Sequence, residues 1–477
     1  MRKKIIVAGA GHSGLTTAAQ LARAGFDVTV YERLAKADLG YDWYDAVNPN
    51  VFRVVGCPHP GEKCIPWQWR QDITYFGPNT AQKHKVVQKF KKPEDIEIIM
   101  ERKDIYKLLI GFAEDNGVKM EYGVTILGPL LIGDRVVGIA TDHGDVYADL
   151  VIDAAGMNSP VRKQLPDCLH IQKEILKNER IYTYRAFYDL PVDPKSVVDR
   201  YKVMFRPDPC EDFSLSWITT QDTYTDLLIG HMTPMSDEEI DDIAAWYRKT
   251  NPQLGPNRLR GGQTVPIPFR RPLSILVADG YAAIGDSAFM TMPLNCSGIS
   301  TSIEVSKILA DAILADQTQT FSAETLWPYQ YNFFKKIGQG LAPIALVKDL
   351  IISIDHQQTD YAFDTGIITW RELTITADQH SIWNFLHFDP KLPKRGVTLA
   401  KDKELLKRAA GTIADTAEFL AWLQVLPRRY SRAAVQRWAK GYDAIFTRRV
   451  KTYFPASFYR DETEQNSKER NVTYENV

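Results

Sequence analysis

The chain is poor in cysteine and has almost no net charge. Its 477 residues include 5 Cys, and 58 Lys and Arg against 59 Asp and Glu give a formal charge of -1. An odd number of scattered cysteines speaks against a disulfide scaffold and favours a reducing compartment. A net charge this close to zero argues against a nucleic acid or another polyanion as partner.

Metal and membrane motifs are also missing. Cys57 and Cys64 are too far apart for a CxxC pair and no second pair completes a zinc site, so we predict no metal. No window holds 18 uncharged apolar residues, so we predict no transmembrane helix. The basic and apolar N-terminus is similar to a signal peptide, but the next residues complete a pattern that needs it. We therefore expect a cytoplasmic protein.

The first motif is a glycine-rich turn between a strand and a helix. Residues 3–33, KKIIVAGAGHSGLTTAAQLARAGFDVTVYER, read as strand, turn, helix and strand, with Gly9, Gly11 and Gly14 in a GxGxxG pattern. Such glycines allow a tight turn, a close approach of a pyrophosphate and close packing of helix on strand. Glu32 closes the second strand, where a carboxylate can accept from ribose hydroxyls. The motif predicts a dinucleotide site and leaves FAD or NAD open.

A second motif lies far along the chain, in residues 279–304, DGYAAIGDSAFMTMPLNCSGISTSIE. A short apolar run ends on Gly285 and Asp286, and a helix is expected to begin after Pro293 and Gly298. The arrangement suits a carboxylate and a helix N-terminus directed at one ligand. The acid/base constellation of a nicotinamide dehydrogenase is not evident, so this motif is expected to contact the same dinucleotide.

The order of these motifs resembles a flavoprotein family. Between them lie a predicted helix that begins at Arg102 and the strand and loop DVYADLVIDAAGMNSPVRKQL at 145–165. Over residues 1–330 the order resembles flavoproteins of the p-hydroxybenzoate hydroxylase fold and, among them, the geranylgeranyl reductase family. The implied fold is α/β: a Rossmann-like FAD-binding domain of the glutathione reductase type, an antiparallel β substrate domain and a helical C-terminal region.

The resemblance implies FAD and a set of residues that bind it. These residues are Gly9, Gly11, Gly14, Glu32, Arg33, Arg102, Gly156, Gly285, Asp286, Pro293 and Gly298. Arg102 would reach the pyrophosphate or ribityl region, and Asp286 would accept from ribityl hydroxyls. The helix after Gly298 would point its N-terminus at the flavin ring. Arg102 could instead be a surface ion-pair partner, and Asp286 only a helix cap.

Three departures from the hydroxylase pattern weaken an NAD(P)H-dependent hydroxylase assignment. Ala155 and Gly156 replace an Asp-Gly pair, Phe289 stands where His is common, and Cys296 replaces a glycine. Cys296 could tune the flavin, exchange electrons with it, or serve only as a small residue. Catalytic residues stay unassigned, because no Tyr, His or Cys distinguishes itself.

The middle of the chain contains the strand-like runs of a substrate domain. Trp217 and Cys296 are its tentative pocket residues, although Leu215, Thr219 and Thr220 depart from the reductase signature Tyr-x-Trp-x-Phe-Pro. That departure puts isoprenoid specificity in question. The predicted division is residues 1–175 and 273–325 for the FAD-binding domain, 176–272 for the substrate domain, 326–460 for the helical region and 461–477 for a disordered tail.

Two further segments allow more than one interpretation. IPWQWR, residues 65–70, resembles the Trp-x-Trp element of flavin-dependent halogenases, but it lacks the following Ile-Pro and lies too early. The basic helix predicted at 432–451 could lie on an anionic membrane surface, although such helices more often pack on their own protein.

These observations together predict an FAD-dependent oxidoreductase. The expected reaction is reduction of carbon–carbon double bonds in an apolar or lipid-like substrate, with electrons from NAD(P)H or another protein. The first alternative is an FAD-dependent monooxygenase that uses NAD(P)H and oxygen. The second is a non-catalytic flavin-binding redox sensor built around Cys296.

Overall fold

The structure is a computed structural model that describes residues 2–88, 96–207, 213–369 and 392–454. The predicted tail at 461–477 lies outside these residues. Within them no single helix is long and apolar enough to cross a bilayer. Two consecutive helical segments, Ala323–Ser353 and His356–Asp364, are long and apolar enough only when taken together, and they are bent by 114°.

The glycine-rich motif lies in a six-stranded sheet. The strand order is β18 (Val277–Ala278), β19 (Tyr281–Ala283), β12 (Leu150–Asp153), β1 (Lys4–Ala8), β2 (Asp27–Glu32) and β8 (Lys119–Tyr122). β1 pairs in parallel with both β2 and β12, and only β18 is antiparallel to its neighbour. Ile5, Ile6 and Val7 of β1 are buried, as expected for a central parallel strand.

Three helices cover this sheet and position the motifs. They are α1 (His12–Arg23), α3 (Arg102–Asp115) and α6 (Ile299–Ala315), and α1 contacts both of the others.

Two three-stranded sheets lie nearby. The first has the order β11 (Gly144–Tyr147), β10 (Arg135–Thr141) and β9 (Ile126–Ile132), and the second has the order β3 (Tyr44–Val47), β7 (Ile98–Glu101) and β4 (Gln68–Trp69). The short helices are α2 (Asn50–Val55) and α4 (Pro160–Lys163). α3 and α6 begin where the sequence predicted a helix start.

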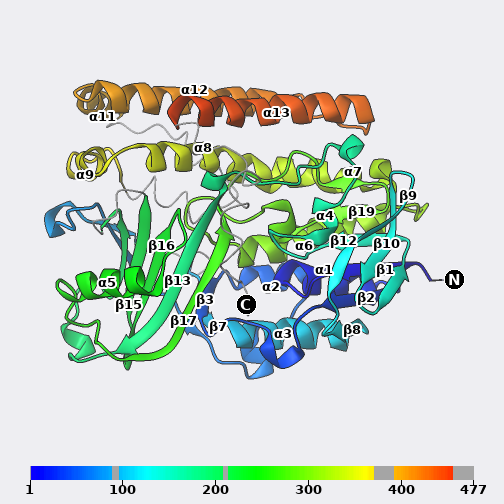
Figure 1. Cartoon of the computed structure of the whole chain (residues 1–477), viewed down its shortest axis with the longest axis horizontal. Helices are drawn as coiled ribbons and strands as arrows, with labels where there is room; N and C mark the ends of the chain where they lie inside the picture. The colour runs from blue at the N-terminus through cyan, green and yellow to red at the C-terminus, as the bar shows by residue number, and fades with distance from the viewer. Residues whose placement is uncertain (1, 89–95, 208–212, 370–391, 455–477) are drawn as a thin grey trace.

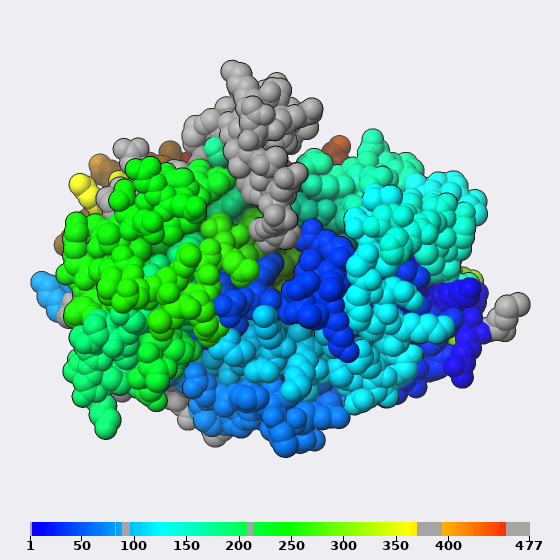
Figure 2. Space-filling model, turned by 60° about the horizontal axis from the view of Figure 1, so that its bottom comes forward, coloured from blue at the N-terminus to red at the C-terminus, as the bar shows by residue number. Residues whose placement is uncertain are grey.

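A seven-stranded sheet lies beside the domain of the six-stranded sheet (Figure 1), and in the space-filling view the green residues that include most of its strands adjoin the blue and cyan ones (Figure 2). Its order is β17 (Arg258–Pro268), β13 (Arg180–Asp189), β16 (Tyr224–His231), β15 (Ser214–Thr220), β14 (Tyr201–Phe205), β5 (Ile73–Phe76) and β6 (Val86–Gln88). All neighbours are antiparallel except β14 and β5. The predicted range 176–272 therefore omits two strands, which join the sheet from a segment without clear strand periodicity.

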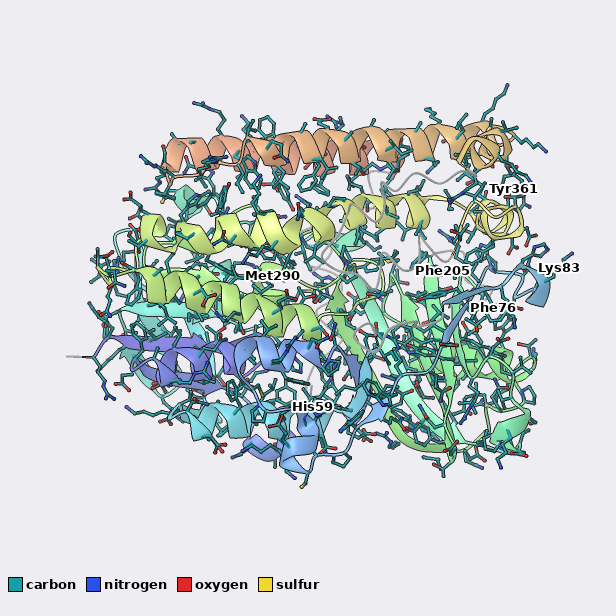
Figure 3. The ribbon with its side chains drawn as sticks, turned by 180° about the vertical axis from the view of Figure 1, so that it is seen from behind. His59, Phe76, Lys83, Phe205, Met290 and Tyr361 are labelled. Carbon is teal, nitrogen blue, oxygen red and sulfur yellow. The ribbon has the colours of Figure 1, made fainter. Side chains whose placement is uncertain are left out.

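The two faces of this sheet have different neighbours. Residues on one face, including Phe76 and Met204, pack against α5 (Asp237–Arg248). Phe205 belongs to a separate cluster on the opposite face. Figure 3 shows Phe76 and Phe205 on neighbouring strands, and Met290 in the adjoining domain that contains the six-stranded sheet. This second face is the one that borders the site described below.

The C-terminal third is a stack of helices. These are α7 (Ala323–Phe333), α8 (Gln339–Ser353), α9 (His356–Asp364), α11 (Leu392–Leu399), α12 (Lys403–Gln424) and α13 (Arg432–Tyr453). α12 and α13 form an outer layer over α8 (Figure 1). Val435, Trp438 and Ile445 of α13 are buried in this stack, so the apolar stripe of the basic helix packs on its own protein.

Candidate active site

The turn between β1 and α1 leaves no room for most side chains. Gly9 has a φ of +97°, and a Cβ there would lie 2.5 Å from the Ala154 carbonyl oxygen. A Cβ at Gly14 would lie 2.4 Å from the Gly9 oxygen. At Gly11 the nearest atom is 3.6 Å away, so this side of the turn is open. No described side chain caps α1 at Gly11, and the helix start can hold a phosphate.

Glu32 borders the same turn. Its carboxylate accepts from the Ala10 backbone N–H at 2.9 Å and from the Leu34 N–H at 3.0 Å. These bonds fix the carboxylate at the end of β2, where ribose hydroxyls are expected in this type of fold. The neighbouring Arg33 is exposed.

Arg102 forms a partly buried ion pair rather than a surface one. Its Nε and Nη2 donate to the two carboxylate oxygens of Asp45 at 2.6 and 2.7 Å. Burial opposes the charged form of Arg102, but Asp45 outweighs it and raises the pKa of the guanidinium. Burial alone would raise the pKa of Asp45, yet Arg102 outweighs it, so this pKa is lowered. Both groups therefore stay charged.

Asp286 and the glycines beside it shape a second part of the site. Asp286 accepts from the Thr291 hydroxyl at 2.5 Å, and burial raises its pKa against the opposing effects of Thr291 and Arg102. A Cβ at Gly285 would lie 2.4 Å from Ser13 Oγ, and one at Gly298 would lie 2.6 Å from Thr291 Oγ1. Both glycines thus allow a close approach of neighbouring segments.

The remaining predicted residues lie around this centre. Gly298 precedes the first turn of α6, which no described side chain caps. Pro293 is buried in the turn before it. Gly156 follows β12 with a φ of +83° and open space around its Cβ position. Asp153, the acid two residues before Ala155, is buried and accepts from Ser159 and Tyr281, so it takes no part in the cavity described next.

A cavity of about 190 Å³ separates these residues from the seven-stranded sheet. On the nucleotide side it is lined by His12, Asp45, Arg102, Asp286, Cys296, Gly298 and Ile299. On the sheet side it is lined by Tyr75, Arg185, Tyr201, Val203, Phe205, Leu215, Trp217 and Ile267, and by Arg70 beside the sheet. The structure thus brings Arg102, Asp286 and Gly298 together with Trp217. Among the described residues, no group of three or more His, Cys, Asp or Glu could hold a metal ion.

Cys296 lies in the cavity with an unusual backbone conformation. It is partly buried, and its φ is +59°, in the left-handed region that glycine favours. Burial, and then Asp286, raise the pKa of its thiol to about 12. A thiol that stays protonated at neutral pH is a poor nucleophile. This argues against a reactive redox centre at Cys296.

Asp45, Arg70 and Tyr201 are among the cavity residues that were not singled out from the sequence. Arg70 forms an ion pair with Glu97, and its Nη2 donates to the Tyr201 hydroxyl at 2.7 Å. No local motif marks these residues, because each partner comes from a distant part of the chain. Only the alternation of Tyr201, Val203 and Phe205 along β14 could have indicated a common face.

Comparisons with known proteins agree with this geometry. Residues 7–60 match the family described as NAD(P)-binding Rossmann-like domain. A digeranylgeranylglycerophospholipid reductase from Sulfolobus acidocaldarius is 23% identical over 392 residues, 78% of this chain and 82% of that protein. The protein of the same name from Haloferax volcanii is 22% identical over 379 residues, 75% of this chain and 87% of that protein. The chain is a relative of the geranylgeranyl reductases.

Solved structures confirm the predicted fold class. A geranylgeranyl bacteriochlorophyll reductase-like protein from Thermoplasma acidophilum superposes with a TM-score of 0.67 and 15% identity, covering 86% of this chain and 99% of that one. A probable FAD-dependent monooxygenase from Pseudomonas aeruginosa superposes with a TM-score of 0.56 and 18% identity. The match covers 76% of this chain and 100% of that chain. The relationship to the reductases agrees with the predicted oxidoreductase and with FAD as its cofactor. The uncapped starts of α1 and α6 and the open side of the turn at Gly11 are compatible with FAD.

Proposed function

We propose that the chain is an FAD-dependent oxidoreductase that reduces carbon–carbon double bonds of an apolar, lipid-like substrate. The observation that supports this most is the shared cavity, with residues suited to FAD on one side and an apolar sheet on the other. Bound reduced FAD would supply the hydride for such a reduction. NAD(P)H is the electron donor that we favour for reducing the oxidised FAD again.

On the nucleotide side, the residues bind and orient the cofactor. The glycine turn and the start of α1 would hold the pyrophosphate. Asp45 occupies Nε and Nη2 of Arg102, which leaves Nη1 for an oxygen of the pyrophosphate or ribityl chain. Thr291 donates to Asp286, whose carboxylate would accept from ribityl hydroxyls, and the start of α6 would direct its positive dipole end toward the ring.

On the sheet side, the residues bind an apolar chain and exclude water. Val203 pairs with Trp217, and Phe205 pairs with Leu215, on adjacent antiparallel strands. Val203, Phe205 and Leu215 are each buried. Such a wall favours an apolar substrate over a polar one and keeps bulk water from the reacting carbons.

A visible spectrum, followed by anaerobic reduction and readmission of air, tests the proposal. We expect a flavin band, at least after FAD is added, slow reoxidation in air and faster anaerobic reoxidation when an unsaturated lipid is present. Absence of a flavin band with added FAD would overturn the proposal. Fast reoxidation in air with an oxygenated product would instead establish the monooxygenase, which the fold of the Pseudomonas aeruginosa protein makes the second candidate. Flavin that no substrate reoxidises would favour the redox sensor.

A further inference from the structure

The outer layer of helices is strongly basic. Residues 392–454, which form α11, α12 and α13, contain 14 Lys and Arg against 5 Asp and Glu, whereas the whole chain has a formal charge of -1. Eleven of these cations are exposed, but only two of the acids are, Glu404 and Glu418. Glu404 pairs with Arg408, and Glu418 pairs with Arg448. Such an asymmetry within a nearly neutral chain indicates an anionic partner for this layer.

The exposed sides of α12 and α13 form one surface, the outer face. Both helices pack on α8 and on each other, so the sides turned away from α8 point out of the protein together (Figure 1). Helical spacing places the exposed cations of each helix opposite its buried residues. The cations of the outer face are Lys403 and Lys407 of α12, and Arg437, Lys440 and Lys451 of α13. None of the five has a carboxylate partner among the described residues, and the ion pairs of these two helices involve other arginines.

The outer face also exposes small and aliphatic side chains. On α12 the exposed residues that follow Lys407 along this side are Ala410, Ala414, Ala417 and Ala421. Their short side chains let a flat partner approach the helix closely. Ile413 and Val425 of α12 or its end are 66% and 60% exposed. A polyanion such as a nucleic acid binds through its phosphates and makes no use of these aliphatic groups, whereas the boundary of a bilayer accepts them together with cations.

The inner side of α13 contacts the wall of the cavity through one apolar cluster. The cluster includes Phe205 and Leu215 of the sheet side, Ile352 of α8, and Val450 and Phe454 at the end of α13. The helix that presents cations to the outside thus belongs, on its inner side, to the cluster that forms the apolar wall. A surface bound at the outer face would lie against the helices that back this wall.

We propose that the outer face of α12 and α13 binds the surface of an anionic membrane. The cations would contact lipid phosphates, and the aliphatic side chains would reach the boundary between headgroups and acyl chains. The attachment is peripheral and depends on charge, because the apolar stripe of α13 packs on the protein itself. The binding does not depend on the proposed function. Its consequence, which is access of the cavity to a lipid-like substrate held in the bilayer, rests on that function.

Flotation of the FAD-loaded protein with vesicles tests the proposal. The vesicles contain phosphatidylcholine alone, or equal parts of phosphatidylcholine and anionic phosphatidylglycerol. We expect binding to the anionic vesicles only, and release at high salt. Lys403→Gln/Lys407→Gln should weaken this binding about 25-fold, the equivalent of about 2 kcal/mol, because each Lys or Arg near an anionic surface contributes about 1 kcal/mol. Arg437→Gln/Lys440→Gln, made independently on α13, should have the same effect.

Lys103→Gln/Lys107→Gln is the matched control. These two lysines are exposed and lie four positions apart on α3, as Lys403 and Lys407 do on α12, but α3 is on the opposite side of the molecule (Figure 1). Binding to the anionic vesicles should therefore stay unchanged. Equal losses in the α3 and α12 variants would overturn the proposal, as would equal binding to the two kinds of vesicle or binding to neither. Duplex DNA bound as tightly as the anionic vesicles would also overturn it, since the face would then recognise any polyanion.

Turnover separates this proposal from the proposed function. Reduction of an unsaturated lipid is measured with the lipid in anionic vesicles and in micelles of a neutral detergent. Lys403→Gln/Lys407→Gln should lower the rate with vesicles and leave the rate with micelles unchanged. Reduction in micelles by a protein that does not bind the vesicles would overturn the proposal and leave the proposed function standing. Vesicle binding that depends on the outer face, without reduction in either preparation, would support the proposal and overturn the proposed reduction.

Discussion

The two sides of the cavity are built in opposite ways. The nucleotide side depends on backbone segments that approach so closely that Gly9, Gly14 and Gly285 have no room for a Cβ. The sheet side depends on side chains of separate strands, such as Val203 and Trp217, which meet only through strand pairing. The first side therefore tolerates almost no substitution at its glycines, whereas the second can be rebuilt by side-chain exchange. The two sides therefore differ in how easily their contacts can be altered: backbone shape sets the first, and exchangeable side chains set the second.

The largest effect is expected at the ion pair that joins the strand β3 to α3. Arg102→Met removes one partner of a partly buried pair, with side chains 16 and 17% exposed, and leaves Asp45 without its counter-charge, so we expect a cost of about 3 kcal/mol, at the lower end of the range for buried pairs. FAD affinity should fall as well, because Arg102 lines the cavity. Chemical denaturation and FAD titration measure the two effects. Lys36→Met, which breaks the exposed pair with Glu114, is the control and should cost less than about 1 kcal/mol. Equal losses in both variants would contradict this prediction.

The next effect is expected in the glycine turn. In Gly14→Ala the new Cβ would meet the Gly9 oxygen at 2.4 Å and Val7 Cγ1 at 3.2 Å, so the turn must open. Overpacking of this kind costs about 1–3 kcal/mol, and we expect FAD to bind about 100-fold more weakly, or about 2.7 kcal/mol. Calorimetric titration with FAD gives the affinity.

Gly111→Ala is the matched control for that variant. Apart from the backbone of α3 itself, no atom of the described residues lies within 4 Å of its Cβ position, so the protein should gain about 0.5–1 kcal/mol of stability and bind FAD normally. If Gly14→Ala bound FAD as tightly as Gly111→Ala, the close approach of the two segments would not be what this side requires.

A pH effect of intermediate size is expected from His12. Burial, and then Arg102, lower the pKa of His12 to about 3, while Asp45 opposes the shift. In the unfolded chain His12 is protonated below about pH 6.5. Between about pH 3 and 6.5 the unfolded chain therefore binds more protons than the folded protein does. The contribution of neutral His12 to stability is complete above pH 6.5 and is lost as the pH falls toward 3.

The loss should reach about 1 kcal/mol between pH 6.5 and 5.5. Denaturation of the FAD-free protein at both pH values, compared with His12→Asn, isolates it from other titrating groups. His12→Asn should be less sensitive to pH by that amount. An unchanged pH dependence in the variant would show that His12 does not stay neutral in the folded protein.

The same contrast explains what the sequence could predict. The glycine turn, the acid at the end of β2 and the helix starts at Arg102 and Ile299 are fixed by residues close together in the chain, and local spacing reveals them. Arg70 and Tyr201 are 131 positions apart, and Arg102 and Asp45 are 57 apart. Such pairs arise from strand order and from packing between domains, so no local pattern encodes them. The parallel pairing of β5 with β14 was hidden for the same reason.

The smallest effect is expected at Cys296, where the two sides of the cavity meet. A side chain in the left-handed region costs about 1–2 kcal/mol, and a glycine there loses about 0.5–1 kcal/mol through its more flexible unfolded state. Cys296→Gly should therefore raise the free energy of unfolding by about 0.5 kcal/mol, and Cys296→Ala, which keeps the strain, should not. FAD affinity should be equal in both variants. A Cys296→Gly variant less stable than Cys296→Ala would mean that contacts of the side chain outweigh the backbone strain, as on the sheet side. A redox response that is lost in both variants would restore the redox-sensor alternative.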